Sequence, residues 1–169
     1  MKISMKNSDA GVDFLAMRIV IVLLLVAVLI AAAAAYVEGY TNNMSRNSAR
    51  QELTKVAEAA RSIYVESCPD TGDSVNVDMK IPESVRIAVF GGLPGNNTTI
   101  EREPTAYYLE YKDGSLETYV TNVRYAKLNM SSGNASDEPV VIYPGGHSLR
   151  IELRTLNDTA VAAIAGGLS

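Results

Sequence analysis

The sequence predicts an α+β protein in which a long N-terminal helix packs on an antiparallel β-sheet domain. Three observations predict it: an apolar run near the N-terminus, a helix-periodic segment directly after that run, and alternating apolar residues from residue 75 onward. The chain of 169 residues is 47% hydrophobic and 20% charged, and this composition is typical of a folded domain with an apolar appendage.

The first predicted element is a transmembrane helix over residues 14–37, preceded by an N-terminal cytoplasmic tail over residues 1–13. Seventeen consecutive apolar residues fill positions 19–35, with Arg18 and Tyr36 at the two interfaces. A helix of seventeen to twenty-four residues covers about 25 to 36 Å, which matches the hydrocarbon core of a bilayer. A retained single-pass anchor is therefore the preferred interpretation.

A cleaved secretory signal is the alternative. Its positive region, apolar core and alanine-rich cleavage region would be Lys2, Lys6 and Arg18, then residues 19–30, then residues 31–35. Against it, the charged region is long and contains Asp9 and Asp13, and the helical pattern continues past the alanines. In both interpretations the folded domain leaves the cytoplasm.

The expected orientation places the C-terminal domain outside the cytoplasm. Lys and Arg are balanced on the two sides of the span, so the positive-inside rule does not decide. Arg18 abuts the span, and six N-x-Ser/Thr sequons, which are N-glycosylation acceptors in exported proteins, all follow it. These sequons begin at Asn43, Asn96, Asn97, Asn129, Asn134 and Asn157.

Residues 38–67 are predicted to form an amphipathic helical stalk that continues the span. Its apolar residues recur at helical spacing and make up one face: Leu53, Val56, Ala57, Ala60, Ile63 and Tyr64. Between the span and this face, Gly39 is the only glycine and there is no proline. The helix should end near Ser67, because Cys68 precedes Pro69 and a residue before proline disfavours helical backbone angles.

Residues 68–169 are predicted to form an extracytoplasmic antiparallel β domain covered by that helical face. Alternating apolar residues predict strands over residues 75–81, 85–89, 106–112, 116–124, 140–143 and 149–153, with loops over residues 91–99 and 129–138. Asp113-Gly114 predicts a hairpin with a type I′ turn, and Pro144-Gly145-Gly146 predicts a second turn. Residues 159–164 fit either a last strand or a short helix.

Candidate chemistry is sparse, and the sequence predicts no enzyme, no cofactor and no metal site. One histidine and one cysteine exclude most zinc sites and catalytic triads. His147 is expected to be exposed in a turn. Cys68 is expected to be buried or unreactive, with pairing between chains as the alternative. The glycines from Gly91 to Gly95 lack the helix start of a phosphate-binding loop and are expected to form a plain turn.

A group of tyrosines in the hairpin region fits two interpretations. Tyr107, Tyr108, Tyr111, Tyr119 and Tyr125 could stack on sugars or bases, but tyrosine is also an ordinary strand former. Residues 37–169 carry twelve basic and seventeen acidic residues, a net charge of −5. Nucleic acid is therefore not an expected partner.

The order of parts resembles that of type IV pilin-like proteins, including archaeal pilins and filament accessory subunits. The resemblance is carried by Gly11 before the apolar run, the span, the helical face that begins at Leu53, and the strands from Val75 onward. It implies that a prepilin peptidase would cut after Gly11 and that the apolar helices would pack in a filament core. Ala10 before Gly11, Ala16 in the place of a glutamate, and Arg18 depart from the family pattern.

The function expected from these features is that of a membrane-anchored surface protein. It would act in a cell-surface structure or filament-associated assembly through contacts with the bilayer, with other surface proteins or with copies of itself, and the sequons and layout point to an archaeal cell. The alternative is a monomeric extracytoplasmic module with a cleaved signal, which binds a surface glycan or a protein through the tyrosine-rich hairpin.

Overall fold

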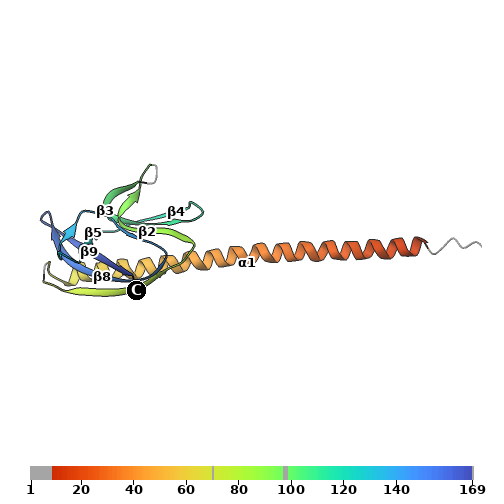
Figure 1. Ribbon diagram of the computed structural model, residues 1–169, viewed down its shortest axis with the longest axis horizontal. Helices are drawn as coiled ribbons and strands as arrows, with labels where there is room; N and C mark the ends of the chain where they lie inside the picture. The colour runs from red at the N-terminus through yellow and green to blue at the C-terminus, as the bar shows by residue number, and fades with distance from the viewer. Residues whose placement is uncertain (1–8, 70, 97–98, 169) are drawn as a thin grey trace, which may run out of the picture. The chain divides into compact units, whose positions relative to one another are not determined.

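The computed structural model describes residues 9–69, 71–96 and 99–168. The chain divides into two compact units, Met1–Asn43 and Met44–Ser169. Helix α1 (Asp9–Glu66) begins in the first unit and ends in the second. Two β-sheets belong to the second unit, together with the last part of α1 (Figure 1). The predicted α+β fold class is confirmed.

Helix α1 is continuous from the apolar run into the amphipathic segment, as the absence of proline predicts. Gly39 does not interrupt it, and a Cβ built at that position would meet no atom within 4 Å. The helix ends at Glu66, and the amide of Ser67 still donates to the carbonyl oxygen of Ile63 at 3.1 Å. This end agrees with the stop predicted from Cys68-Pro69. The finer division into tail, span, stalk and β domain stays a prediction.

Among the described residues, one sheet has five strands in the order β1-β8-β9-β5-β6. Their bounds are β1 Ser74–Ile81, β5 Tyr125–Leu128, β6 Ala135–Ser136, β8 Gly145–Leu156 and β9 Thr159–Leu168. All pairs are antiparallel except β5 with β9, which is parallel. The sequence-based expectation of a purely antiparallel domain is therefore corrected at this one pair.

The other sheet, within the part of the chain that the structure describes, has four antiparallel strands in the order β4-β3-β2-β7. Their bounds are β2 Val85–Pro94, β3 Ile100–Tyr111, β4 Leu116–Val120 and β7 Val140–Ile142. Strands β2 and β3 are longer than predicted: β2 continues to Pro94, into the expected loop region, and β3 begins at Ile100, directly after it. The register of β2 with β3 is irregular between Phe90 and Gly92. The glycines at the start of that region thus lie in a bulged strand rather than in a plain turn.

The hydrophobic core lies between α1 and both sheets, in the second unit. Four residues from the predicted helical face, Leu53, Val56, Ala60 and Ile63, are at most 2% exposed and join one buried cluster with side chains from both sheets. The helix therefore supplies the cover that an apolar sheet face needs. The predicted role of this face in the core is confirmed.

The structure decides between the two interpretations of residues 159–164 and shows what the turn at Pro144 connects. Residues 159–164 lie in β9, in the interior of the five-stranded sheet, so the strand interpretation is the correct one. The turn at Pro144 does not join two neighbouring strands, because β7 belongs to the four-stranded sheet and β8 to the five-stranded sheet. The chain changes sheets there.

The Asp113-Gly114 hairpin is present, but its predicted type I′ turn is wrong. Gly114 has a φ of 82°, whereas Asp113 is not among the described residues of positive φ. The two-residue turn with positive angles lies instead at Asn157 (φ 50°) and Asp158 (φ 60°), between Leu156 and its pairing partner Thr159. Two consecutive positive angles are the requirement of a type I′ turn.

Candidate functional site

The first candidate is the apolar surface of α1, defined as residues 16–37. Every residue of this segment is exposed. The large apolar side chains in it range from 46% exposed at Val26 to 76% at Tyr36. Monomeric soluble proteins do not expose an apolar patch of this extent, so the surface requires a lipid or protein environment. In the described part of the chain, α1 is the helix long and apolar enough to cross a membrane.

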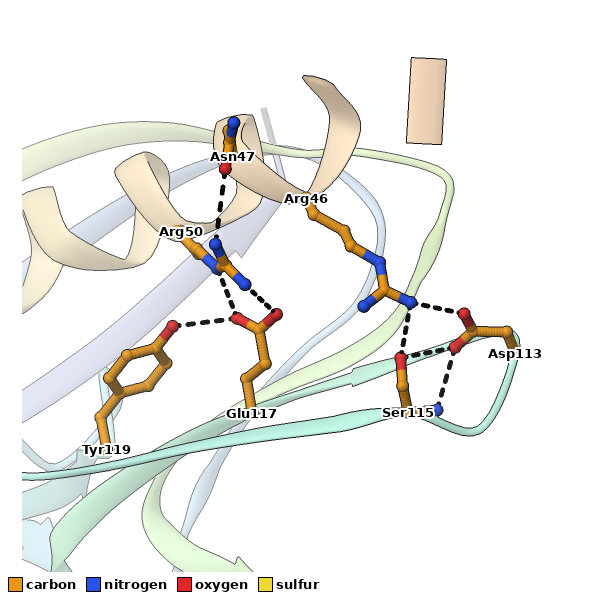
Figure 2. Close-up of polar contacts among 7 residues, drawn as sticks. All are labelled: Arg46, Asn47, Arg50, Asp113, Ser115, Glu117 and Tyr119. Atoms are coloured by element: carbon orange, nitrogen blue, oxygen red, sulfur yellow. Dashed lines mark hydrogen bonds and ion pairs between the residues drawn. The ribbon is translucent and has the colours of Figure 1, made fainter. Parts of the chain in front are cut away.

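A second feature of functional interest is a polar clamp that joins α1 to the β3–β4 hairpin within the second unit. We define it as Arg46, Arg50, Asp113, Ser115, Glu117 and Tyr119 (Figure 2). In its outer half, Arg46 Nη2 donates to Asp113 Oδ2 at 2.5 Å and to Ser115 Oγ at 2.9 Å. The Arg46 guanidinium also lies 4.6 Å from the centre of the Tyr111 ring, which adds a cation–π contact.

The inner half of the clamp is a bidentate ion pair between Arg50 and Glu117. Arg50 Nε and Nη2 donate to the two carboxylate oxygens of Glu117 at 2.7 and 2.6 Å, and Tyr119 Oη donates to Glu117 Oε2 at 2.9 Å (Figure 2). These hydrogen bonds, that from Arg50 foremost, lower the pKa of Glu117. The same contact raises the pKa of Arg50. Both groups are therefore charged at neutral pH, and the hairpin is oriented on the helix.

Two further groups, one in the clamp and one beside it, have pKa values that their surroundings shift. Hydrogen bonds from the side chain and backbone of Ser115 lower the pKa of Asp113. Burial raises the pKa of Tyr111 to about 12, with a further increase from the charge of Glu117. The carboxylates Asp113 and Glu117 are therefore ionised at neutral pH, and the Tyr111 hydroxyl keeps its proton.

The glycine-rich segment is occupied by an arginine of the same chain. Arg102 Nη2 donates to the carbonyl oxygen of Tyr125 at 2.7 Å, Nε donates to Asp137 at 2.8 Å, and Nη1 donates to the carbonyl oxygen of Gly91. A Cβ at Gly91, which has a φ of 77°, would lie 2.3 Å from Arg102 Nη1. Gly91 is therefore needed for the close approach of this guanidinium.

The tyrosines do not form a ligand platform. Tyr108, Tyr111 and Tyr125 are at most 2% exposed, and Tyr107 is 8% exposed. Tyr107 stacks on Tyr119 with ring centres 4.9 Å apart, and it also contacts Phe90 and Tyr125 inside the core. Sugar binding by a tyrosine-rich hairpin surface is therefore wrong for these four residues, because their faces are already packed.

The structure also places the isolated reactive residues. His147 lies in strand β8 rather than in a turn, and its Nε2 is 2.8 Å from the carbonyl oxygen of Tyr143. Cys68 is free and exposed, so the expectation that it is buried is wrong. The described residues include no group of three or more His, Cys, Asp or Glu side chains arranged to hold a metal ion.

Five of the six predicted sequon asparagines are described, and all five are exposed: Asn43, Asn96, Asn129, Asn134 and Asn157. Asn97 lies outside the described residues. Two of the five also have a backbone role, since Asn129 Oδ1 accepts from the Ser131 amide at 3.0 Å and Asn157 forms the type I′ turn. Gly11, the implied processing site, lies near the start of α1. Use of these sites stays a prediction.

The comparisons with known proteins add no relative. No family model, curated protein or solved structure matches the chain.

The polar clamp is the feature that sequence reasoning missed. Arg50 and Glu117 are 67 positions apart, and neither belongs to a recognisable motif. The periodicity of residues 51–64 placed the buried face of the helix but started one residue after Arg50. A signal was nevertheless present, because two arginines four residues apart lie on the same side of a helix.

Proposed function

We propose that this chain is a non-enzymatic, single-pass membrane protein whose sheet-containing unit stands outside the cytoplasm and acts through protein contacts. Its place would be a cell-surface structure or a filament-associated assembly of pilin-like layout. The observation that carries the proposal is the fully exposed apolar surface at residues 16–37, on the same helix whose last part is buried in a closed hydrophobic core. The first part needs an environment that the chain itself does not supply.

The chemistry of the second unit supports a contact protein rather than a catalyst. Tyr107, Tyr108, Tyr111 and Tyr125 are buried in its core, Arg102 donates to the carbonyl oxygens of Gly91 and Tyr125, and the clamp carboxylate Glu117 is held ionised by Arg50. The exposed asparagine sequons fit a surface in contact with the cell exterior. We therefore assign the bilayer and other surface proteins, including copies of this chain, as partners.

The alternative is a secreted monomeric module whose N-terminal segment is removed as a signal. The exposed apolar surface also favours this candidate, because a signal sequence passes the same test of length and apolarity. The ligand of such a module would be a protein rather than a glycan held on the tyrosine-rich hairpin, since those rings are buried.

The experiment is mass spectrometry of the mature N-terminus combined with alkaline extraction of membranes from cells that make the full chain. A retained anchor predicts a start at Met1 and a chain that stays in the membrane pellet. Processing after Gly11 predicts a start at Val12, again in the pellet. A start near Tyr36 with release into the medium would establish the secreted module.

Orientation is tested on the same membranes with a protease added from outside. Digestion of the sheet-containing unit in intact cells supports the proposed orientation, and protection until the cells are lysed contradicts it. Treatment with a glycosidase, or the single variants Asn96→Gln and Asn134→Gln, then reports whether the exposed sequons carry glycans, by loss of mass. Recovery of the complete chain as a soluble cytoplasmic protein would overturn the proposal.

A further inference from the structure

In residues 9–69, 71–96 and 99–168, the two sheets end in four edge strands, β1 and β6 on one sheet and β4 and β7 on the other. Edge strands expose unpaired backbone groups, and soluble proteins normally protect them with charges, prolines, bulges or short length. Strand β6 has two residues, and β7 has three and lies between Pro139 and Pro144. These two edges are too short to recruit another strand. Strands β1 and β4 are longer.

Strand β4 is the least protected of the four edges. Its outward side chains are Leu116, Thr118 and Val120; Thr118 is exposed, and the two apolar ones are 49% and 75% exposed. The strand contains no proline and one charge, Glu117, which Arg50 already neutralises. An exposed edge of this kind, with two apolar side chains and a single charge that is already paired, is a template for strand pairing.

The backbone groups of β4 that are free can be identified from its pairing with β3. Tyr111 N–H donates to the carbonyl of Ser115 at 2.9 Å, and Thr121 N–H donates to the carbonyl of Thr105 at 2.8 Å. Because the direction of backbone groups alternates along a strand, the odd-numbered residues of β4 bond to β3. The N–H and C=O groups of Leu116, Thr118 and Val120 therefore point to the open side.

The same argument applies to β1. The amide of Lys80 donates to Glu52 Oε2 at 3.2 Å, away from the paired strand β8, so helix α1 closes the end of this edge. The even-numbered residues of β1 thus point their backbone groups outward. Ser74, Asn76 and Asp78 are exposed, and the segment from Ser74 to Asp78 remains open.

The two open edges run in opposite directions along the last part of α1. Arg46 contacts Asp113 and Arg50 contacts Glu117, so β4 runs with the helix. Lys80 lies against Glu52, and Ser84 bonds to Ser45 at 2.5 Å, so the chain from β1 onward runs against it.

We infer that strand β4 of one chain pairs antiparallel with strand β1 of a second copy, which joins the sheets of neighbouring subunits. This inference deepens the proposed function, on which it rests, by naming the partner and the contact. Pairing β4 with β1 keeps the α1 segments of both copies in the same direction, as expected for chains anchored side by side in one membrane. An antiparallel pair of two β4 strands would oppose them. Because the contact is head to tail, it builds rings or filaments rather than closed dimers.

One register satisfies both the backbone and the faces of the sheets. It places Thr118 opposite Asn76, Val120 opposite Ser74 and Leu116 opposite Asp78 of the second copy, all through outward backbone groups. The same register puts Tyr119 opposite Val75 and Glu117 opposite Val77, on the side of the sheet that faces α1 in each chain. The solvent-facing side of one subunit's sheet therefore continues the solvent-facing side of the next subunit's sheet, as a continuous sheet requires.

Charge at one end of the two edges agrees with this arrangement. The open part of β1 is preceded by Asp73, and β4 is followed by Arg124. In this register Asp73 of the second copy lies opposite Thr121, on the side of Arg124, so opposite charges approach each other there. At the other end Asp78 lies opposite Leu116, and Lys112 is paired with Glu83 of its own chain.

The test uses the full chain in its own membranes, in a Cys68→Ser background that removes the exposed free thiol. One tagged version carries Thr118→Cys and a second, with a different tag, carries Asn76→Cys. A short bismaleimide is the probe, because side chains of a hydrogen-bonded strand pair are too far apart for an unstrained disulfide. The expected result is a crosslinked product with both tags when the versions are expressed together, and none from either version alone.

A proline variant tests strand pairing without disturbing the fold. The N–H of Thr118 does not bond to β3, so Thr118→Pro removes only an edge donor, whereas Thr118→Val keeps it. With reporter cysteines at Val120 and Ser74, the proline variant should lower the yield of mixed product about tenfold, the effect of one or two lost hydrogen bonds. The valine variant should leave it unchanged.

Two results overturn the inference while the proposed function stands. The first is a product from the Thr118→Cys version alone, which means that two β4 edges meet. The second is a chain that resides in the membrane but gives no mixed product. A chain that is absent from the membrane fraction contradicts the proposed function instead.

Discussion

The two parts of helix α1 have similar backbones and opposite relations to their surroundings. In residues 16–43 every residue is exposed although most are apolar, whereas in residues 44–66 the apolar residues Leu53, Val56, Ala60 and Ile63 are at most 2% exposed. The difference lies in the pattern of side chains. A helix that is apolar on all sides cannot bury its whole surface against one sheet. A helix with one apolar face can bury that face against a sheet and leave its polar side in water. One helix therefore serves two environments.

The largest expected effect comes from placing the same charge in each part. Val56 is fully buried and Val26 is 46% exposed. We expect Val56→Asp to destabilise the second unit by about 4 kcal/mol or more, because a carboxylate is buried without a partner. We expect Val26→Asp to leave that stability unchanged and to oppose membrane insertion by about 2.5–3.5 kcal/mol. Thermal unfolding in detergent and alkaline extraction measure the two quantities; equal unfolding effects would break the comparison.

A second pair of variants tests the packing rather than charge. Leu53 is 1% exposed, so Leu53→Ala should lower the free energy of unfolding by about 2–5 kcal/mol through lost burial and the cavity left behind. Leu25 is 58% exposed, and Leu25→Ala should have no measurable effect on unfolding. Urea unfolding of the detergent-solubilised chain compares them. A loss for Leu25→Ala as large as that for Leu53→Ala would contradict the assignment of the core.

A smaller effect is expected inside the core that surrounds the second part of α1. The Tyr125 hydroxyl is buried without a hydrogen-bond partner, and burial raises the pKa of Tyr125 to about 12. Tyr125→Phe should stabilise the fold by about 1 kcal/mol, because it removes an unsatisfied group. Tyr119→Phe should destabilise it by a similar amount, since its hydroxyl bonds to Glu117. Unfolding transitions that shift in the same direction would refute this contrast.

The smallest expected effect concerns the polar clamp and pH. The folded chain holds the pKa of Glu117 below its ordinary value of 4.5. The stabilisation from the Arg50 pair is therefore complete above that value and is lost as the pH falls through the lowered folded pKa. Because the Arg50 side chain is 48% exposed, the loss should be only about 0.2–1 kcal/mol.

Urea unfolding at neutral pH and near pH 3 measures this loss in the parent chain and in Glu117→Gln. The glutamine variant should lose less stability on acidification, and the matched variant Glu138→Gln should behave like the parent. Identical acid sensitivity of all three proteins would exclude the clamp as a source of the pH dependence.

Local pattern was sufficient for the helix and for most strands. The unbroken helix, its end before Pro69 and its buried face followed from periodicity and from one proline. Periodicity was not sufficient for β9, where residues from Val161 to Ala165 are all at most 4% exposed. A strand buried on both faces shows no alternation, and its small side chains suit a helix equally well.

Turns and surfaces depended on partners that a local pattern does not contain. Asp113-Gly114 has the composition of a type I′ turn, yet the type I′ angles occur at Asn157-Asp158, where two strands pair directly across a two-residue loop. The tyrosines of the hairpin region suit a ligand surface or a core, and only the packing of Phe90 and Tyr125 against Tyr107 places them inside.

The sequence by itself determined where the chain is apolar, where it is helical and where it alternates, because these properties depend on neighbouring residues. Only the tertiary structure decided which apolar residues are covered, which sheet each strand joins, and which edges stay open. Those outcomes depend on pairs such as Arg50 with Glu117 and β5 with β9, whose members are far apart along the chain. Their contact arises from the arrangement of the whole unit around the last part of α1, and no local propensity encodes it.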